Sequence, residues 1–202
     1  MKRRLIICLL AFAAATCSRP KMQDFSLSNF VPPNGPAVVA LVAVDGKIVY
    51  SGASGFANIE KRIPAKISHL FNMASVSKHF TAMAILLLET EGKITASDSV
   101  RKYIPELPKY AEQITIRHLL HHQGGLPAYE NICGSEDAPM TNKNVTDFLA
   151  ATKQPEFAAG SRYSYSNSGY VVLAEIVSRA SGKAFADFMR ERIFKPVGMT
   201  DT

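Results

Sequence analysis

The sequence predicts an α/β fold, in which an antiparallel sheet packs with helices and a mostly helical lobe follows from about Asp98 onward. Two observations predict it. β-branched runs joined by Asp45-Gly46 are typical of a hairpin, and later stretches repeat apolar residues at the spacing of helices. With 202 residues, 47% hydrophobic and 20% charged, the chain has the composition of one globular domain.

The hairpin is expected over residues 37–50. The runs 37–44 and 47–50 flank Asp45-Gly46, a pair that favours a type I′ turn because both central residues of this turn need positive φ. A sheet therefore starts here.

A helix is expected over residues 75–91, with Gly92 at its end. Its apolar stripe is wide, which predicts a helix that is buried on several sides and central to the domain. Further helices are expected over 114–120, 169–180 and 184–194, and Met83 and Met189 are expected in the core.

Residues 1–16 have the layout of a secretory signal, because three cations precede a short apolar run that ends in small residues. The alternative is a buried N-terminal helix. The predicted organisation is a signal peptide at 1–16, a linker at 17–36 and a domain at 37–202, in an exported protein that is periplasmic or extracellular. Lipid attachment at Cys17 is a second hypothesis, although Thr16 departs from the usual lipoprotein box.

Charge and cysteine content exclude several classes of function. The formal charge of +6 falls to +3 without Lys2, Arg3 and Arg4, and no basic patch interleaved with aromatic residues occurs, so no nucleic-acid partner is expected. The apolar run of the signal is too short for a transmembrane span in the mature chain. Cys133 stands alone in the predicted domain, so no intramolecular disulfide framework is available.

Ser75 and Lys78 place a hydroxyl and an amine three residues apart at the start of the predicted helix, where side chains at this spacing are neighbours. A serine becomes a strong nucleophile when a base takes its proton, and a lysine near a helix N-terminus is favoured in its neutral form. The pattern alone also fits an ordinary N-cap serine, and Ser18 to Lys21 repeats it in the predicted linker.

The segment from His69 to Ala82 resembles the active-serine segment of the β-lactamase and penicillin-binding-protein superfamily, in its class C β-lactamase and D-alanyl-D-alanine carboxypeptidase or esterase branch. Four further segments agree in the same order: 55–58, 116–127, 163–170 and 196–202. The resemblance implies a β-lactamase-like fold and a serine hydrolase that forms an acyl-enzyme on a β-lactam, a D-Ala-D-Ala peptide or an ester.

The resemblance also implies a tyrosine in a Y-x-N element beside the serine. Two such elements occur, at Tyr165 and at Tyr129. Tyr165 is preferred because it precedes an apolar helix that can hold it, whereas Tyr129 lies in a loop rich in Gly and Pro and is expected to be a surface aromatic. The implied catalytic residues are Ser75, Lys78 and Tyr165, and Asn167 is implied to bind substrate or orient Lys78.

No metal and no cofactor are expected. His118, His121 and His122 fit no zinc motif with acidic or thiol ligands, and the resemblance makes His118 and His122 structural members of a helix-to-loop junction. The expected partner is a small-molecule or peptidoglycan-like substrate.

The family's last catalytic element, a C-terminal strand that donates to the oxyanion, is not found in the sequence. We therefore expect an N-terminal part of such a hydrolase, with an incomplete sheet and little or no turnover as it stands. The alternative is an inactive relative or fragment that binds cell wall or protein.

Overall fold

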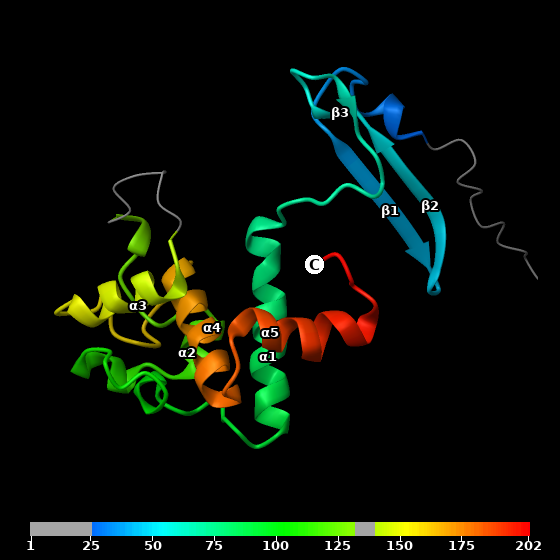
Figure 1. Cartoon of the computed structure of the whole chain (residues 1–202). Helices are drawn as coiled ribbons and strands as arrows, with labels where there is room; N and C mark the ends of the chain where they lie inside the picture. Colours follow the sequence, from blue (N-terminus) through cyan, green and yellow to red (C-terminus); the bar gives the residue numbers. More distant parts are fainter. Residues whose placement is uncertain (1–25, 132–139) are drawn as a thin grey trace, which may run out of the picture. The chain divides into compact units, whose positions relative to one another are not determined.

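A computed structural model describes residues 26–131 and 140–202, and the chain divides into two units between Phe71 and Asn72 (Figure 1). The predicted signal peptide at 1–16 lies outside the described residues, as do Cys17 and Cys133.

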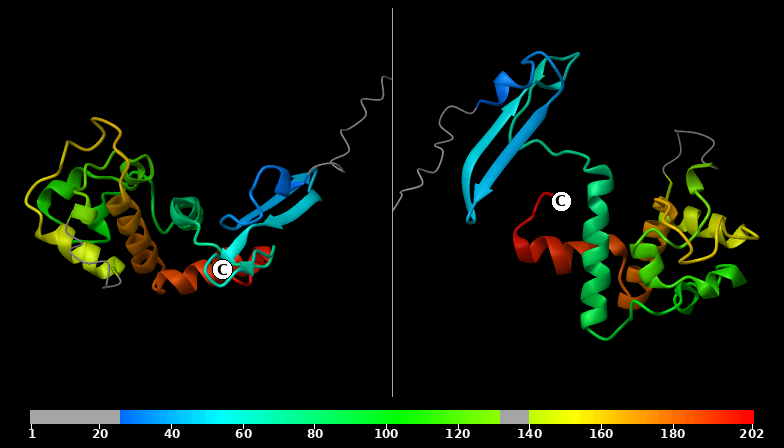
Figure 2. Two further views of the ribbon diagram at one scale, coloured as in Figure 1. Left: turned by 90° about the horizontal axis from the view of Figure 1, so that it is seen from above. Right: turned by 180° about the vertical axis from the view of Figure 1, so that it is seen from behind.

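The first unit is built on the predicted hairpin. Strand β1 (Val38–Val44) pairs antiparallel with β2 (Lys47–Ser54), and Figure 2 shows them as one long two-stranded ribbon. Asp45 and Gly46 both have positive φ, 52° and 73°, as a type I′ turn requires, so the predicted hairpin is confirmed. A shift in register between Val42 and Ala43 bends the ribbon locally.

A second small sheet joins β3 (Phe56–Asn58) to β4 (Ile63–Pro64), also antiparallel. The described part of the predicted linker contacts β2 and β3. Leu27 is buried and its amide donates to the Tyr50 hydroxyl at 3.1 Å, and the Phe56 amide donates to the Gly35 carbonyl at 2.9 Å. Residues 26–36 therefore belong to this unit, because hydrogen bonds hold them to it.

The second unit is helical, as predicted, and its α-helices close to the expected positions are α1 (Lys78–Thr90), α2 (Ile116–Leu120), α4 (Asn167–Ser181) and α5 (Phe185–Met189). A π-helix, η7 (Arg190–Phe194), continues α5. The predicted helix over 75–91 begins differently, because residues Ala74–Ser77 form a separate 3-10 turn, η3. Helix α3 (Asn142–Ala151) is an addition to the predicted set, and the Thr141 side chain caps it.

Shorter 3-10 turns complete the two units: η2 (Leu27–Asn29), η4 (Val100–Lys102), η5 (Lys109–Gln113), η6 (Tyr129–Asn131) and η8 (Lys195–Val197). No helix in residues 26–131 and 140–202 is both long and apolar enough to cross a membrane.

The core of the second unit lies where α1, α2, α3 and α5 pack with α4. Helix α1 contributes Ala84, Ile85 and Leu88 to it, all at most 1% exposed. The expectation that α1 is buried on several sides, with Met83 in the core, is wrong: Met83 and Leu86 are each 48% exposed. α1 packs on α4 and on η7, and these two residues, three positions apart, lie on an exposed face of the helix. Met189 is buried as expected.

Candidate active site

Ser75 and Lys78 meet at the start of α1. Lys78 is the first residue of the helix, Ser75 lies in the 3-10 turn before it, and the Lys78 ammonium donates to Ser75 Oγ at 3.1 Å. Ser75 is exposed, whereas Lys78 is half-buried. The hydroxyl is therefore open to solvent while its amine partner is partly shielded.

The residue before Ser75 has an unusual backbone. Ala74 has φ of 44°, in the left-handed region that residues other than glycine rarely adopt, and its amide donates to Asn72 Oδ1 at 2.8 Å. Such a conformation costs about 1–2 kcal/mol and persists when its surroundings hold it. Here the Asn72 side chain supplies part of that hold and fixes the turn that presents Ser75.

Tyr165 completes a three-residue cluster with Ser75 and Lys78. Its hydroxyl oxygen lies 2.5 Å from Ser75 Oγ, and either group is able to donate. The Lys78 ammonium lies 4.8 Å from the centre of the Tyr165 ring. Hydrogen bonds from Lys78, and then from Ser75, hold the pKa of the Tyr165 phenol below its usual value of 10. The deprotonated phenolate, which is the form able to accept a proton from Ser75, is therefore more accessible than in an ordinary tyrosine.

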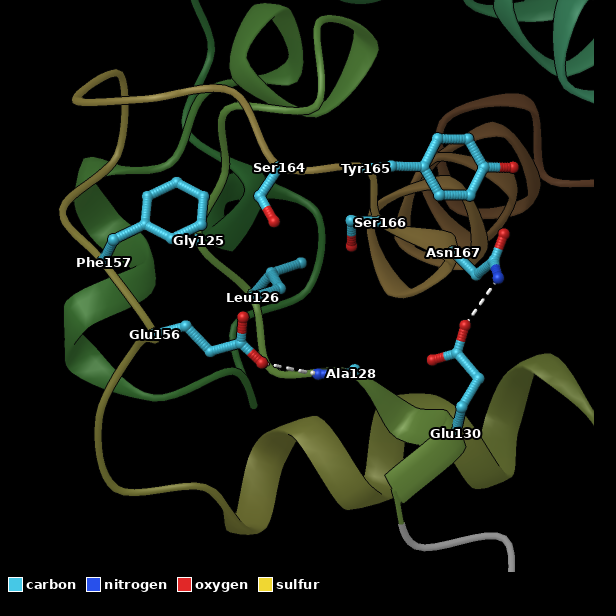
Figure 3. A pocket seen from close by; sticks show the side chains of 10 residues that line it. All are labelled: Gly125, Leu126, Ala128, Glu130, Glu156, Phe157, Ser164, Tyr165, Ser166 and Asn167. Carbon is cyan, nitrogen blue, oxygen red and sulfur yellow. Dashed lines mark hydrogen bonds between the residues drawn. The ribbon is translucent and has the colours of Figure 1, made fainter.

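Asn167 connects the cluster to a carboxylate that the sequence did not suggest. Its Oδ1 accepts from Lys78 Nζ at 2.5 Å, and its Nδ2 donates to Glu130 Oε1 at 2.5 Å, as Figure 3 shows for the second contact. Asn167 is the first residue of α4, and the Ser166 side chain caps that helix by accepting from the Gly169 amide at 3.1 Å. The cap fixes both Tyr165 and Asn167 at one helix end.

The other Y-x-N element, which begins at Tyr129, has a different environment. The Tyr129 amide donates to Ser168 Oγ at 3.1 Å, and the buried Ser168 hydroxyl donates to the Pro127 carbonyl at 2.7 Å. The Tyr129 ring is half-buried against the hydrophobic core, so the expectation of a surface aromatic is wrong. This packing turns the next residue, Glu130, toward Asn167. The Tyr129-Glu130-Asn131 motif therefore pointed to a segment that borders the site. The residue of this motif that reaches the cluster, through Asn167, is Glu130.

The histidines at the predicted helix-to-loop junction make defined hydrogen bonds. His118 and Thr115 cap α2 reciprocally, since the Thr115 amide donates to His118 Nδ1 at 3.3 Å and the His118 amide donates to Thr115 Oγ1 at 3.2 Å. His122 Nδ1 accepts from the Ser166 amide at 3.1 Å. Gln123 accepts at its carbonyl from the Gly160 amide at 2.9 Å. Over the described ranges, no group of three or more His, Cys, Asp or Glu side chains is arranged to hold a metal ion.

A pocket opens beside Tyr165 and Asn167 (Figure 3). Its wall combines apolar and acidic side chains, among them Leu126, Phe157, Glu130 and Glu156. The Glu156 carboxylate accepts from the Ala128 amide at 3.2 Å, which ties the loop to the pocket wall. Tyr165, which contacts Ser75, therefore also borders a pocket that offers both an apolar surface and carboxylates.

Comparison with known proteins places the chain in a family. The family model described as Beta-lactamase matches residues 28–202. The chain is 39% identical over 166 residues to penicillin-binding protein 4* of Bacillus subtilis (strain 168), covering 80% of this chain and 36% of that protein. It is 30% identical over 208 residues to a putative D-alanyl-D-alanine carboxypeptidase of Escherichia coli (strain K12), covering 94% of this chain and 48% of that protein.

Solved structures agree with the sequence matches. The crystal structure of D-amino acid amidase from Ochrobactrum anthropi SV3 complexed with D-phenylalanine is similar with a TM-score of 0.76 at 30% identity, covering 86% of this chain and 48% of that one. The chain therefore spans between about a third and a half of the length of these relatives. The family match extends over most of the chain, and the fold and the resemblance predicted from the sequence are both confirmed: the chain belongs to the beta-lactamase family.

Proposed function

We propose that this chain carries the nucleophile and the proton-transfer groups of a serine hydrolase, with Ser75 as the residue that is acylated. One observation supports this most directly: Ser75 Oγ lies within hydrogen-bond distance of both Lys78 Nζ, at 3.1 Å, and Tyr165 OH, at 2.5 Å. A nucleophile and a base within this reach are the usual signature of covalent catalysis.

The proposed reaction begins when Ser75 Oγ attacks a carbonyl carbon and its proton passes to the Tyr165 and Lys78 pair. The Ser75 backbone N–H at the helix start would be one donor to the oxyanion. Collapse of the tetrahedral intermediate breaks the bond to the leaving group, which takes the proton back from Tyr165. Water then attacks the acyl-enzyme carbonyl and restores the Ser75 hydroxyl.

Asn167 has a positioning role in this proposal. Its Oδ1 accepts from Lys78 and its Nδ2 donates to Glu130, so the amide cannot turn without losing both hydrogen bonds. An amide held in this way keeps the Lys78 amine directed at Ser75. The side of Asn167 that faces the pocket is also available to a substrate.

The substrate class we propose is an acyl compound with a D-configured residue at the cleaved bond, either a D-alanyl peptide or a D-amino acid amide. Two relatives are named for such compounds, one a putative D-alanyl-D-alanine carboxypeptidase and the other a D-amino acid amidase. β-Lactams and simple esters present the same kind of carbonyl to Ser75 and are suitable as probes.

The test is active-site labelling with a fluorescent fluorophosphonate and with a fluorescent penicillin. We expect Ser75→Ala to abolish the labelling and Ser77→Ala, a matched change in the same turn, to retain it. Undiminished labelling of folded Ser75→Ala protein would overturn the assignment. A folded wild-type chain that takes neither probe would favour the alternative of a binding module without turnover.

A further inference from the structure

His122 accepts hydrogen bonds from the amides of the two residues on either side of Tyr165. Its backbone carbonyl accepts from the Ser164 amide at 2.9 Å, and its Nδ1 accepts from the Ser166 amide at 3.1 Å. The two hydrogen bonds come from one residue on the preceding loop and leave the Tyr165 side chain between them. The path of the backbone at Tyr165 therefore depends on His122.

The His122 ring also lies against the rings of nearby tyrosines. Its centre is 4.6 Å from that of Tyr165 and 5.0 Å from that of Tyr170, with small tilts of 33° and 35°, and the Tyr163 ring meets it edge-on at 5.8 Å. The Tyr170 hydroxyl donates to the Leu120 carbonyl at 3.2 Å, which anchors the ring beyond. The imidazole therefore lies between Tyr170, which is anchored by its hydrogen bond, and Tyr165, which contacts Ser75.

The backbone of His122 is held in an uncommon conformation. Its φ is 56°, in the left-handed region that residues other than glycine adopt uncommonly. This conformation lets one residue direct its carbonyl and its side chain to two amides that lie two residues apart.

The contact with Ser166 requires a neutral imidazole. An amide N–H can donate only to a ring nitrogen that bears no proton, and both nitrogens of a histidinium are protonated. Lys78 from α1 brings a positive charge near the ring, which disfavours a histidinium, and around the ring also lie the phenols of Tyr163 and Tyr165, from the segment before α4, and of Tyr170, from α4. Burial, and then the Lys78 charge, hold the pKa of His122 below its usual value of 6.5.

We propose that His122 is a positioning residue that keeps Tyr165 against Ser75 while its imidazole is neutral, and that its protonation releases this hold and slows acylation of Ser75 in acid. The acylation half of this inference rests on the proposed function. The hold of His122 on the segment of Tyr165, which we call the clamp, rests on the hydrogen bonds and ring contacts alone.

Two variants separate the role of His122 as a hydrogen-bond acceptor from the effect of a positive charge on its imidazole. Asparagine places its Oδ1 at the same number of bonds from the backbone as His122 Nδ1, tolerates positive φ and does not titrate. His122→Asn should therefore keep the hydrogen bond with Ser166 and lose the acid sensitivity. His122→Ala removes the acceptor and should slow fluorophosphonate labelling about tenfold or more at pH 7.5.

The first measurement is the labelling rate of the whole chain between pH 5 and 8, taken as the ratio of wild type to His122→Asn. The ratio cancels acid effects that arise away from position 122 in both proteins. We expect it to be constant at pH values well above the pKa of His122 and to fall by about tenfold in total as the imidazole becomes protonated. A ratio that stays constant across the pH range in which the imidazole is seen to titrate, or His122→Ala protein that labels like wild type, would overturn the proposal.

The second measurement does not depend on activity. Nitrogen-15 NMR of the imidazole and of the Ser166 amide should show one titration, with a midpoint below 6.5 and with the amide proton moving at the same midpoint. If wild-type protein is labelled by neither probe, the proposed function fails. The NMR titration still tests whether His122 holds the Tyr165 segment. An imidazole that titrates at 6.5 or above, or a Ser166 amide that does not follow it, would refute the clamp.

Discussion

The hydroxyl oxygens of Ser75 and Tyr165 lie 2.5 Å apart, although 90 residues separate them in the chain. Each hydroxyl stands at the N-terminal end of a helix, Ser75 before α1 and Tyr165 before α4, and the two helices pack against each other. Lys78 and Asn167, the first residues of these helices, are themselves hydrogen-bonded. The cluster is therefore a product of helix packing, and any change that moves one helix end relative to the other should weaken it.

Tyr165→Phe should lower the rate of Ser75 acylation by about 10²-fold, the scale of one general acid–base group. The phenol contacts the Ser75 hydroxyl, and the neighbouring Lys78 holds the pKa of that phenol below its usual value. The measurement is the second-order rate of labelling by a fluorescent penicillin. Tyr129→Phe is the control, since the Tyr129 ring packs against the core, and a rate that falls equally in both variants would show that the wrong tyrosine was chosen.

Glu130→Ala should lower the same rate several-fold, and Glu130→Gln should leave it within about twofold. The reason is the orientation of the Asn167 amide. With its Nδ2 donating to Glu130, its Oδ1 is left to face Lys78, and a glutamine still offers an oxygen to that Nδ2. Labelling of Glu130→Ala protein at the wild-type rate would show that Asn167 needs no such support.

Ala74→Gly should raise the free energy of unfolding by up to about 1 kcal/mol, because glycine adopts positive φ without the steric cost that alanine bears there. The control is Ala82→Gly inside α1, which should lower stability by about 1 kcal/mol. Urea denaturation of both variants is the measurement. If Ala74→Gly destabilises the chain as much as the control does, the left-handed conformation at Ala74 is absent in solution.

Features that depend on neighbours in sequence were predictable. The hairpin follows from Asp45-Gly46, whose φ values match the expected turn, and α4 follows from its periodic apolar residues and from Gly182, which has a φ of 70° at the helix end. Ser75 and Lys78 are one turn apart, so their contact was also expected from spacing alone.

Features that depend on tertiary packing were not predictable. Glu130 meets Asn167 across 37 residues and His122 meets Ser166 across 44, and nothing local to these residues indicates either pairing. Met83 was wrongly expected in the core for the same reason. Helical periodicity groups apolar residues on α1, but it does not show which face of the helix the rest of the fold covers.

We predict that residues 1–16 are removed on export. The leading cations and the short apolar run fit a signal. Mass spectrometry of protein secreted from a bacterial host should find a mature N-terminus near Cys17 or Ser18. An intact Met1 on exported protein would contradict the prediction, and a diacylglyceryl mass on Cys17 would establish the alternative of a lipid anchor.

Asp98 should make the stability of the helical unit depend on pH below about 4. Its carboxylate accepts from the Thr95 amide at 2.9 Å, from Lys102 Nζ at 3.0 Å and from the Tyr103 hydroxyl at 2.6 Å. Burial raises the pKa of this carboxyl, but hydrogen bonds, first from Tyr103 and then from Thr95 and Lys102, outweigh it and lower the pKa to about 2 from 3.8.

Since the pKa of folded Asp98 lies below that of the unfolded chain, its stabilising contribution is complete above about pH 4 and is lost as the pH falls toward 2. Asp98→Asn should therefore lower the free energy of unfolding by about 2 kcal/mol at pH 7, with a difference from wild type that shrinks steadily below pH 4. The control is Asp147→Asn, which breaks an exposed ion pair with Lys143 on α3 and should cost at most about 0.5 kcal/mol. Urea denaturation at several values of pH from 3 to 7 measures both. A difference for Asp98→Asn that does not shrink at pH 3, or that is no larger than the control at pH 7, would mean that these hydrogen bonds do not favour the charged carboxylate in the folded protein.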